Sequence, residues 1–99
     1  MEYKVEVLGK AVITYGYVHQ TIKAAEELSE LLVALNKWLG MSENEDYIRD
    51  NIREECADVE IMLSQLKIIF GDWSDWKHYK MDRLEERLNA INRTEAHDC

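Results

Sequence analysis

The sequence predicts an all-α protein of four helices. Its 99 residues contain no proline, the residue that most strongly interrupts helices, and only four glycines. Three of these, Gly16, Gly40 and Gly71, stand at breaks between segments in which apolar residues recur every three or four positions. A chain of this length is expected to form one domain, which has little stability to spare unless it assembles with copies of itself.

The expected helices follow one another with short connections. The first spans about residues 4–15 and the second about residues 18–39. The polar segment MSENED then leads to a third helix over about residues 46–70, which at some 25 residues is long for so small a domain. A fourth helix is expected over about residues 75–92, after a turn with the sequence GDWSDW and before a frayed tail, TEAHDC.

Each expected helix carries an apolar stripe that we predict to face the interior. The members are Val5, Leu8, Val12 and Tyr15; Ala24, Leu28, Leu31, Leu35 and Trp38; Ile48, Ile52, Val59, Met62, Leu66 and Ile69; and Met81, Leu84, Leu88 and Ile91. Because every segment has such a stripe, we expect part of this surface to be buried against another copy. Closed symmetry favours a homodimer or a homotetramer.

Charge and composition exclude several classes of partner. The formal net charge of -8 argues against a polynucleotide partner, because phosphate contacts need a basic surface. No run has the roughly 18 apolar residues of a membrane span, and the N-terminal segment MEYKVEVLGKAVITYG does not resemble a signal peptide. The two cysteines, Cys56 and Cys99, form neither a CxxC motif nor a disulfide framework. We therefore expect a cytoplasmic protein.

Acidic residues interrupt two of the apolar stripes. Glu27 and Glu55 occupy positions where the pattern calls for an apolar residue, and Glu30 and Asp58 follow three residues later on the same faces. Six pairs of acids have this spacing, so the spacing alone is weak, but an unpaired charge on a buried face is costly. Of the basic residues, Lys23 alone is near Glu27 on its stripe. A hard divalent cation such as Mg²⁺ would balance four carboxylates from two adjacent helices.

These acids carry a resemblance to a known family. The segments EELSEL and EECADV, with 24 residues between Glu30 and Glu55, resemble the EExxE…ExxD signature of the MazG-like all-α nucleoside triphosphate pyrophosphatases. The segment YGYVHQTIKAAEELSELLVALNK resembles a form common in small bacterial and phage members, and WKHYKMDRLEERL resembles the family's final helix. Together these segments cover roughly residues 8–90.

The resemblance implies a fold, an activity and a site. The fold would be a four-helix MazG-like bundle with helices paired within a homo-oligomer, and the nucleotide pocket would lie near subunit contacts. The activity would be Mg²⁺-dependent hydrolysis of a nucleoside triphosphate to a monophosphate and pyrophosphate, as nucleotide-pool housekeeping, with Mn²⁺ as a possible substitute. The metal ligands and catalytic groups carried over are Glu27, Glu30, Glu55 and Asp58.

Further residues are candidates for binding the substrate. The basic candidates for the triphosphate are Lys77, Lys80 and Arg83 on the fourth helix and Lys23 on the second; the candidates for contacting the base or phosphates are His19, Gln20, Trp73 and Trp76. The basic residues of the fourth helix could instead pair with neighbouring acids. The aromatic residues could instead belong to the core.

Two other functions compete with this hypothesis. The chain could be a non-catalytic helical interaction module in which the acids form a structural divalent-ion site. It could also be a carboxylate-bridged redox metal protein, but Asp75-x-x-His78 is not the Glu-x-x-His pattern of di-iron bundles, which disfavours this alternative.

Overall fold

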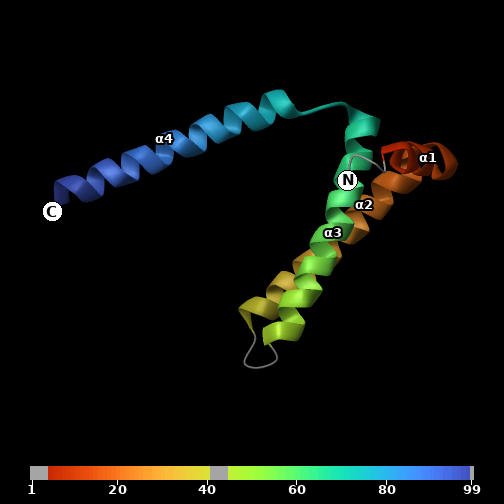
Figure 1. Ribbon diagram of the computed structural model, residues 1–99, viewed down its shortest axis with the longest axis horizontal. Coiled ribbons are helices and arrows are strands. Elements are labelled where there is room, and N and C mark those ends of the chain that lie inside the picture. Colours follow the sequence, from red (N-terminus) through yellow and green to blue (C-terminus); the bar gives the residue numbers. More distant parts are fainter. Residues whose placement is uncertain (1–4, 41–44, 99) are drawn as a thin grey trace.

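The computed structural model describes residues 5–40 and 45–98, with side chains up to residue 94. Its helices are α1 (Val5–Tyr15), α2 (Tyr17–Leu39), α3 (Glu45–Phe70) and α4 (Ser74–Asp98), shown in Figure 1. Within the described residues there is no strand. The prediction of an all-α chain with four helices is therefore confirmed.

The helix boundaries agree with the sequence-based expectation except at α4. This helix continues to Asp98 instead of ending near residue 92, so the segment expected to fray is helical over its described part. Its start at Ser74 agrees with the expected start to within one residue, so Trp76, the last residue of the GDWSDW segment, lies in the first turn of the helix. The connection between α3 and α4 is consequently only three residues long, 71–73.

Two glycines end helices in a backbone conformation that favours glycine. Gly16 (φ 87°) separates α1 from α2, and Gly71 (φ 101°) follows α3. The backbone N–H of each donates to the carbonyl four residues earlier, Val12 O at 2.9 Å and Lys67 O at 2.9 Å, which closes the last turn of the preceding helix. These glycines let the chain change direction sharply at both points (Figure 1).

The packed part of the molecule consists of α2 and α3, which run antiparallel, and α1, which contacts both near the start of α2 and the end of α3 (Figure 1). Its buried apolar side chains are Leu8, Ala24, Ala34, Val59 and Met62. This core is small for 99 residues, and none of the described side chains is both large and fully buried. Hydrophobic burial within one chain is therefore limited.

Helix α4 extends away from this packed part and, over its described length, contacts none of the other three helices (Figure 1). The radius of gyration is 18.3 Å, compared with about 13 Å for a compact domain of this length. The accessible surface is 8217 Å², whereas a compact monomer of 11.7 kDa would expose about 5,900 Å². A single chain thus forms a three-helix unit with an extended arm and does not close into a four-helix bundle.

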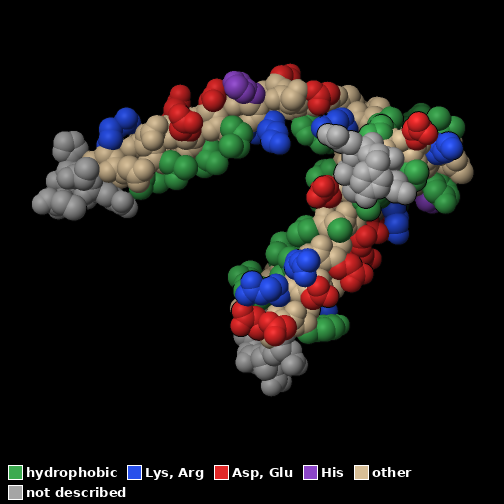
Figure 2. All heavy atoms as spheres, in the orientation of Figure 1, with side chains coloured by type: hydrophobic (Ala, Val, Ile, Leu, Met, Phe, Trp, Pro, Cys, Tyr) green, Lys and Arg blue, Asp and Glu red, His purple; other side chains and the backbone are tan. Residues whose placement is uncertain are grey.

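The predicted interior stripe of α4 is wrong for the single chain. Met81, Leu84, Leu88 and Ile91 are 46–56 % exposed, and Figure 2 shows apolar side chains along one side of this helix. The reason is that α4 has no partner helix among the described residues. In α2 the prediction is wrong for Leu28 and Leu35, which are exposed because the α3-facing stripe is centred on Ala24, Glu27 and Ala34.

The first stripe is likewise only half buried. Leu8 lies in the core, whereas Val5 and Tyr15 are exposed at the ends of α1. None of the helices in the described part of the chain combines the length and the apolar character needed to cross a membrane.

Candidate metal centre

Helix α2 places an acid at the centre of its contact with α3. The residues of α2 that face α3 recur with alternating spacings of four and three, a pattern that keeps them on one side of the helix. They are Gln20, Ala24, Glu27, Leu31, Ala34 and Trp38. The two alanines, each 2 % exposed, let α3 approach closely. Glu27 is consequently only 8 % exposed, which confirms that the acid lies on the buried face.

Helix α3 brings two further acids to the same point. One carboxylate oxygen from each of Glu27, Glu55 and Asp58 can be chosen so that all three lie within 4.8 Å of one another. Glu55 and Asp58 are three residues apart and therefore share a face of α3. We call Glu27, Glu55 and Asp58 the carboxylate cluster. Oxygen ligands at this spacing can be bridged by a hard divalent cation.

Two oxygens of the carboxylate cluster have no partner. Glu27 Oε2 and Glu55 Oε2 are buried and accept no hydrogen bond from any described residue. The other oxygen of Glu27 lies 3.2 Å from Lys23 Nζ, which is the one ion pair that a described base makes with the cluster. A buried carboxylate without a donor is strongly destabilising, so one base does not compensate three acids. Carboxylate oxygens are the ligands that Mg²⁺ and Mn²⁺ prefer, so this donor set fits such an ion, and the cluster has two oxygens without another partner.

Burial and neighbouring carboxylates raise the pKa of Glu55 above its usual value. Burial contributes most to this rise, and the carboxylates of Glu30, Asp58 and Glu27 follow in that order. The pKa of Lys23 is also raised, first by its hydrogen bond to Glu27 and then by the charge of that residue. Both directions describe a region of excess negative charge that attracts cations.

Glu30, the fourth ligand implied by the family resemblance, is not within the carboxylate cluster. It is exposed on α2, one turn beyond Glu27. Its charge nevertheless contributes to the raised pKa of both Glu55 and Lys23. The structure thus brings three of the four predicted ligands together and leaves the fourth at the margin.

The predicted phosphate-binding residues of α4 lie on the arm. Because α4 contacts none of the other helices over its described length, its own chain does not bring Lys77, Lys80 and Arg83 to the carboxylate cluster. None of these three bases forms an ion pair with a described residue, so the alternative of pairing with neighbouring acids is not realised. Arg83 instead lies over the ring of Tyr79, 5.7 Å from its centroid. These three basic groups are available to a ligand.

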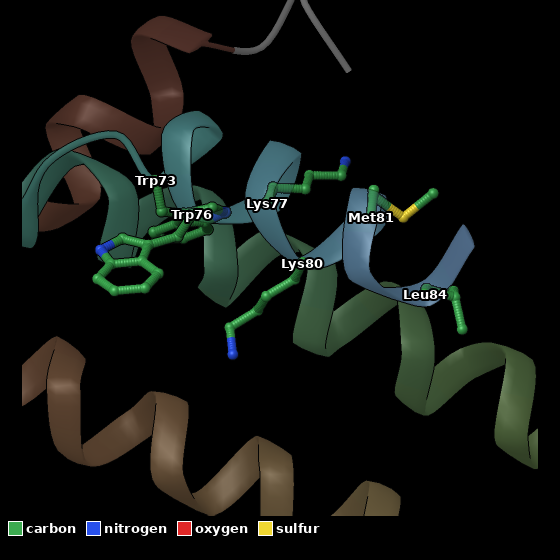
Figure 3. A pocket seen from close by; sticks show the side chains of 6 residues that line it. All are labelled: Trp73, Trp76, Lys77, Lys80, Met81 and Leu84. Atoms are coloured by element: carbon green, nitrogen blue, oxygen red, sulfur yellow. The ribbon is translucent and has the colours of Figure 1, made fainter. Parts of the chain in front are cut away.

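An open pocket of about 470 Å³ lies beside two of these bases, Lys77 and Lys80, at the start of α4. It is lined by Trp73, Trp76, Lys77, Lys80, Met81 and Leu84 (Figure 3). Figure 3 shows the two lysine side chains leaving the helix in different directions, with both tryptophan rings near its beginning. A pocket with aromatic walls and basic groups at its edge has the chemistry to hold an aromatic ring that carries phosphate.

The two tryptophans differ in their surroundings. Trp73 is half-buried, and Lys67 Nζ lies 5.1 Å from the centroid of its ring. Trp76 is exposed and meets the edge of Tyr79, with the ring centroids 6.1 Å apart. Neither ring belongs to the core of the single chain.

The remaining two predicted binding residues occupy the start of α2. His19 is exposed and stacks on Tyr15, with the ring centroids 5.4 Å apart. Gln20 is buried, and its amide already bonds within the protein: its Oε1 accepts from His19 Nδ1 at 2.7 Å and its Nε2 donates to Gln65 Oε1 at 2.7 Å. In this conformation both polar atoms of the Gln20 amide are engaged within the protein.

Gln65 was missed by the sequence analysis, although a signal was present. It stands beside Leu66 on the apolar stripe of α3, between Met62 and Ile69, so it is a polar residue within an apolar pattern, as Glu55 is. The same reasoning that singled out the acids could have paired the two glutamines.

Comparison with known proteins adds no further information to the geometry. No protein-family model, no curated protein and no solved structure matches the chain.

Proposed function

We propose that this protein is a Mg²⁺-dependent nucleoside triphosphate pyrophosphohydrolase of the MazG-like type. The observation that carries the proposal is the convergence of Glu27, Glu55 and Asp58, two of which have a buried oxygen without a partner. The spacing of these acids in the sequence, which resembles the EExxE…ExxD signature, supports the same activity. The bond broken would be the one between the α-phosphorus and the oxygen that bridges to the β-phosphate.

The carboxylate cluster would hold the cation, and the charge of Glu30, which helps to raise the pKa of Glu55, would add to the attraction. Bound Mg²⁺ supplies charge neutralisation for the triphosphate and orients a water for in-line attack. The carboxylates would hold the ion between two helices, where the side chain of Glu27 is buried. One of them accepts the proton of the attacking water, and pyrophosphate leaves as the monophosphate forms.

A second copy of the chain would complete the site. The basic groups of α4 carry the charge that a triphosphate needs, yet α4 does not reach the carboxylate cluster of its own chain over the described residues. An arm that packs on a neighbouring copy can deliver Lys80 and Arg83 to that copy's cluster. We therefore place the substrate between copies.

The amount of exposed surface supports this assembly. The accessible area exceeds that of a compact monomer by roughly 2,300 Å² per chain. A stable interface removes about 800 Å² from each partner, so the excess is enough for one or two interfaces. The exposed stripe of α4 and the exposed leucines of α2, Leu28, Leu32, Leu35 and Leu39, are the surfaces that such interfaces would cover.

A panel of canonical and modified nucleoside triphosphates tests the activity. We expect the parent protein with Mg²⁺ to convert at least one of them to its monophosphate and pyrophosphate, separated by chromatography. The matched control is the Asp58→Asn protein, prepared identically, which removes a contaminating phosphatase as an explanation. Release of orthophosphate instead of pyrophosphate, or equal turnover by both proteins, would overturn the proposal.

A non-catalytic interaction module is the second candidate. The exposed apolar stripe of α4 favours it, because such a surface fits a partner protein as well as a second copy. In that case the carboxylate cluster would be a structural ion site. The same panel separates the two functions, since the module binds Mn²⁺ but turns over no nucleotide.

A further inference from the structure

The contact between α2 and α3 contains one hydrogen bond between side chains that are both buried. Gln20 and Gln65 are the only glutamines in the sequence, and they are 5 % and 4 % exposed. Gln20 Nε2 donates to Gln65 Oε1 at 2.7 Å, while Gln65 Nε2 has the sulfur of Met62 at 3.6 Å as its partner. A thioether is a weak acceptor, so the second amide is only partly satisfied.

Stability alone does not account for this pair. A hydrogen bond between neutral side chains contributes little net stability, and apolar groups of similar shape in both positions are often as stable or more so. A polar contact within an otherwise apolar helix interface has a better-attested effect, which is to specify the register of the two helices at some cost in stability. The position of the pair relative to the carboxylate cluster shows what this register determines.

The glutamine pair and the carboxylate cluster lie one seven-residue repeat apart along the same interface between α2 and α3. Glu27 follows Gln20 by seven residues on α2, and Asp58 precedes Gln65 by seven residues on α3. Because the helices are antiparallel, one step of two turns, about 10.5 Å, leads from the glutamine pair to the Glu27–Asp58 contact. Fixing the axial position of one pair therefore fixes the other.

The apolar residues between the glutamine pair and the carboxylate cluster do not set the register of the two helices themselves. At the intervening positions lie Ala24 on α2 and Val59 and Met62 on α3, which are buried and apolar. Apolar stripes with a seven-residue repeat remain matched when one helix slides by a repeat, so such contacts tolerate displacement. Three carboxylates repel one another and favour displacement. A directional hydrogen bond opposes it.

We propose that the Gln20–Gln65 hydrogen bond positions α2 against α3 so that Glu27 meets Glu55 and Asp58 in the geometry that binds a divalent cation. Gln20 and Gln65 are thus positioning residues and do not themselves touch the ion. This inference rests on the proposed function insofar as the cluster is a metal site.

The test replaces both glutamines by methionine, which has nearly the same length and shape but cannot form the bond. We expect the Gln20→Met/Gln65→Met protein to keep or raise its Tm without metal and to bind Mn²⁺ at least about 10-fold more weakly, as loss of groups that orient metal ligands typically does. Mn²⁺ alone is the probe, and its free fraction is measured by electron paramagnetic resonance. A purely stabilising pair would instead lower the Tm.

Two further variants serve as controls for this experiment. Gln20→Leu/Gln65→Leu removes the same bond with a different shape, in case the methionines misfold. Trp38→Leu weakens the α2–α3 contact eleven residues from Glu27 and should change the Tm but leave Mn²⁺ affinity within two-fold of the parent. A general loss of stability is thereby distinguished from a loss of Mn²⁺ affinity.

A distance measurement between two spin labels reports the register of α2 against α3 in the absence of metal. One nitroxide label is attached to the native Cys56, which is exposed on α3, and one to Ser29→Cys on α2, with Cys99→Ser and an excess of unlabelled protein. We expect a narrow distance distribution in the parent and a broadened or shifted one in the double-methionine protein. An unchanged distribution, or unchanged Mn²⁺ affinity with a changed distribution, overturns the inference. If the parent protein binds no Mn²⁺, the proposed function is wrong. The distance distribution then tests only whether the glutamine pair sets the register of α2 against α3.

Discussion

The α2–α3 pair and the α4 arm are each incomplete in opposite ways. The pair buries charge that it does not neutralise: three carboxylates converge and two of their oxygens lack partners. The arm exposes apolar surface that it does not cover, together with three bases, Lys77, Lys80 and Arg83, that pair with no described acid. The carboxylate cluster lacks positive charge, and these bases of the arm carry it.

This complementarity teaches more than either region does alone. A bare amphipathic helix that projects into solvent derives little stability from packing, because most helical stability in proteins comes from burial of an apolar face. A buried acidic cluster likewise lowers stability until a cation binds. Both defects disappear if the arm of one copy covers a second copy and the triphosphate and its metal join the bases to the acids. Four predictions test this view, beginning with the largest expected effect.

Removing an acid from the cluster should have the largest effect. We expect Asp58→Asn to lower turnover by more than about 100-fold, because even residues that merely orient metal ligands contribute 10–100-fold. Without metal the same variant should have a higher Tm, because one of three repelling charges is gone. Glu60→Gln, an exposed acid on the same helix, is the control and should change neither quantity. Normal turnover by Asp58→Asn would separate the cluster from catalysis.

Charging the apolar stripe of α4 should split the assembly. For Leu84→Glu/Leu88→Glu we expect the mass from light scattering coupled to size exclusion to fall to about that of the 11.7 kDa chain, with activity lost in parallel. Asn89→Glu adds a charge to the same helix off the stripe and should leave both unchanged. A parent protein that is already a monomer with full activity would show that no second copy is needed.

Loss of a single phosphate contact should have a smaller effect. We expect Arg83→Ala to lower kcat/KM by 10- to 100-fold, since a hydrogen bond to a charged group contributes about 1.5–3 kcal/mol. Mn²⁺ affinity should not change, and Arg87→Ala, one turn further along α4, should retain activity. Mixing Arg83→Ala with Asp58→Asn should then restore part of the activity, because one mixed site would contain both native groups. Absence of any restoration would argue that base and acids belong to one chain.

The sequence could predict the parts of this molecule that depend on local pattern. Glycines at breaks in helical periodicity located three helix ends, and an acid in an apolar stripe located Glu27 and Glu55. Both signals are local, because a cap needs one residue of unusual backbone conformation and a buried charge disrupts one stripe.

The sequence could not predict which apolar faces meet. The stripe Met81, Leu84, Leu88 and Ile91 has the same pattern as a core-facing stripe, but periodicity does not say whether the partner lies in the same chain. On α2 two leucine-containing stripes compete, and small alanines decided the contact with α3 because they allow close approach. The marginal place of Glu30 follows from this choice of face.

The smallest expected effect concerns pH and sharpens the account of the cluster. Burial and nearby acids raise the pKa of Glu55 in the folded protein, so its ionisation opposes folding. This destabilisation is absent below the usual pKa of glutamate, about 4.3, and grows as the pH rises through the raised value. We therefore expect the Tm of metal-free Glu55→Gln to match the parent near pH 4 and to exceed it by a few degrees at neutral pH. Saturating Mg²⁺ should reverse the order, because only the parent keeps a complete site. A difference that stays constant from pH 4 to 7, measured beside Glu60→Gln, would show that the charge of Glu55 is not what disturbs the α2–α3 contact.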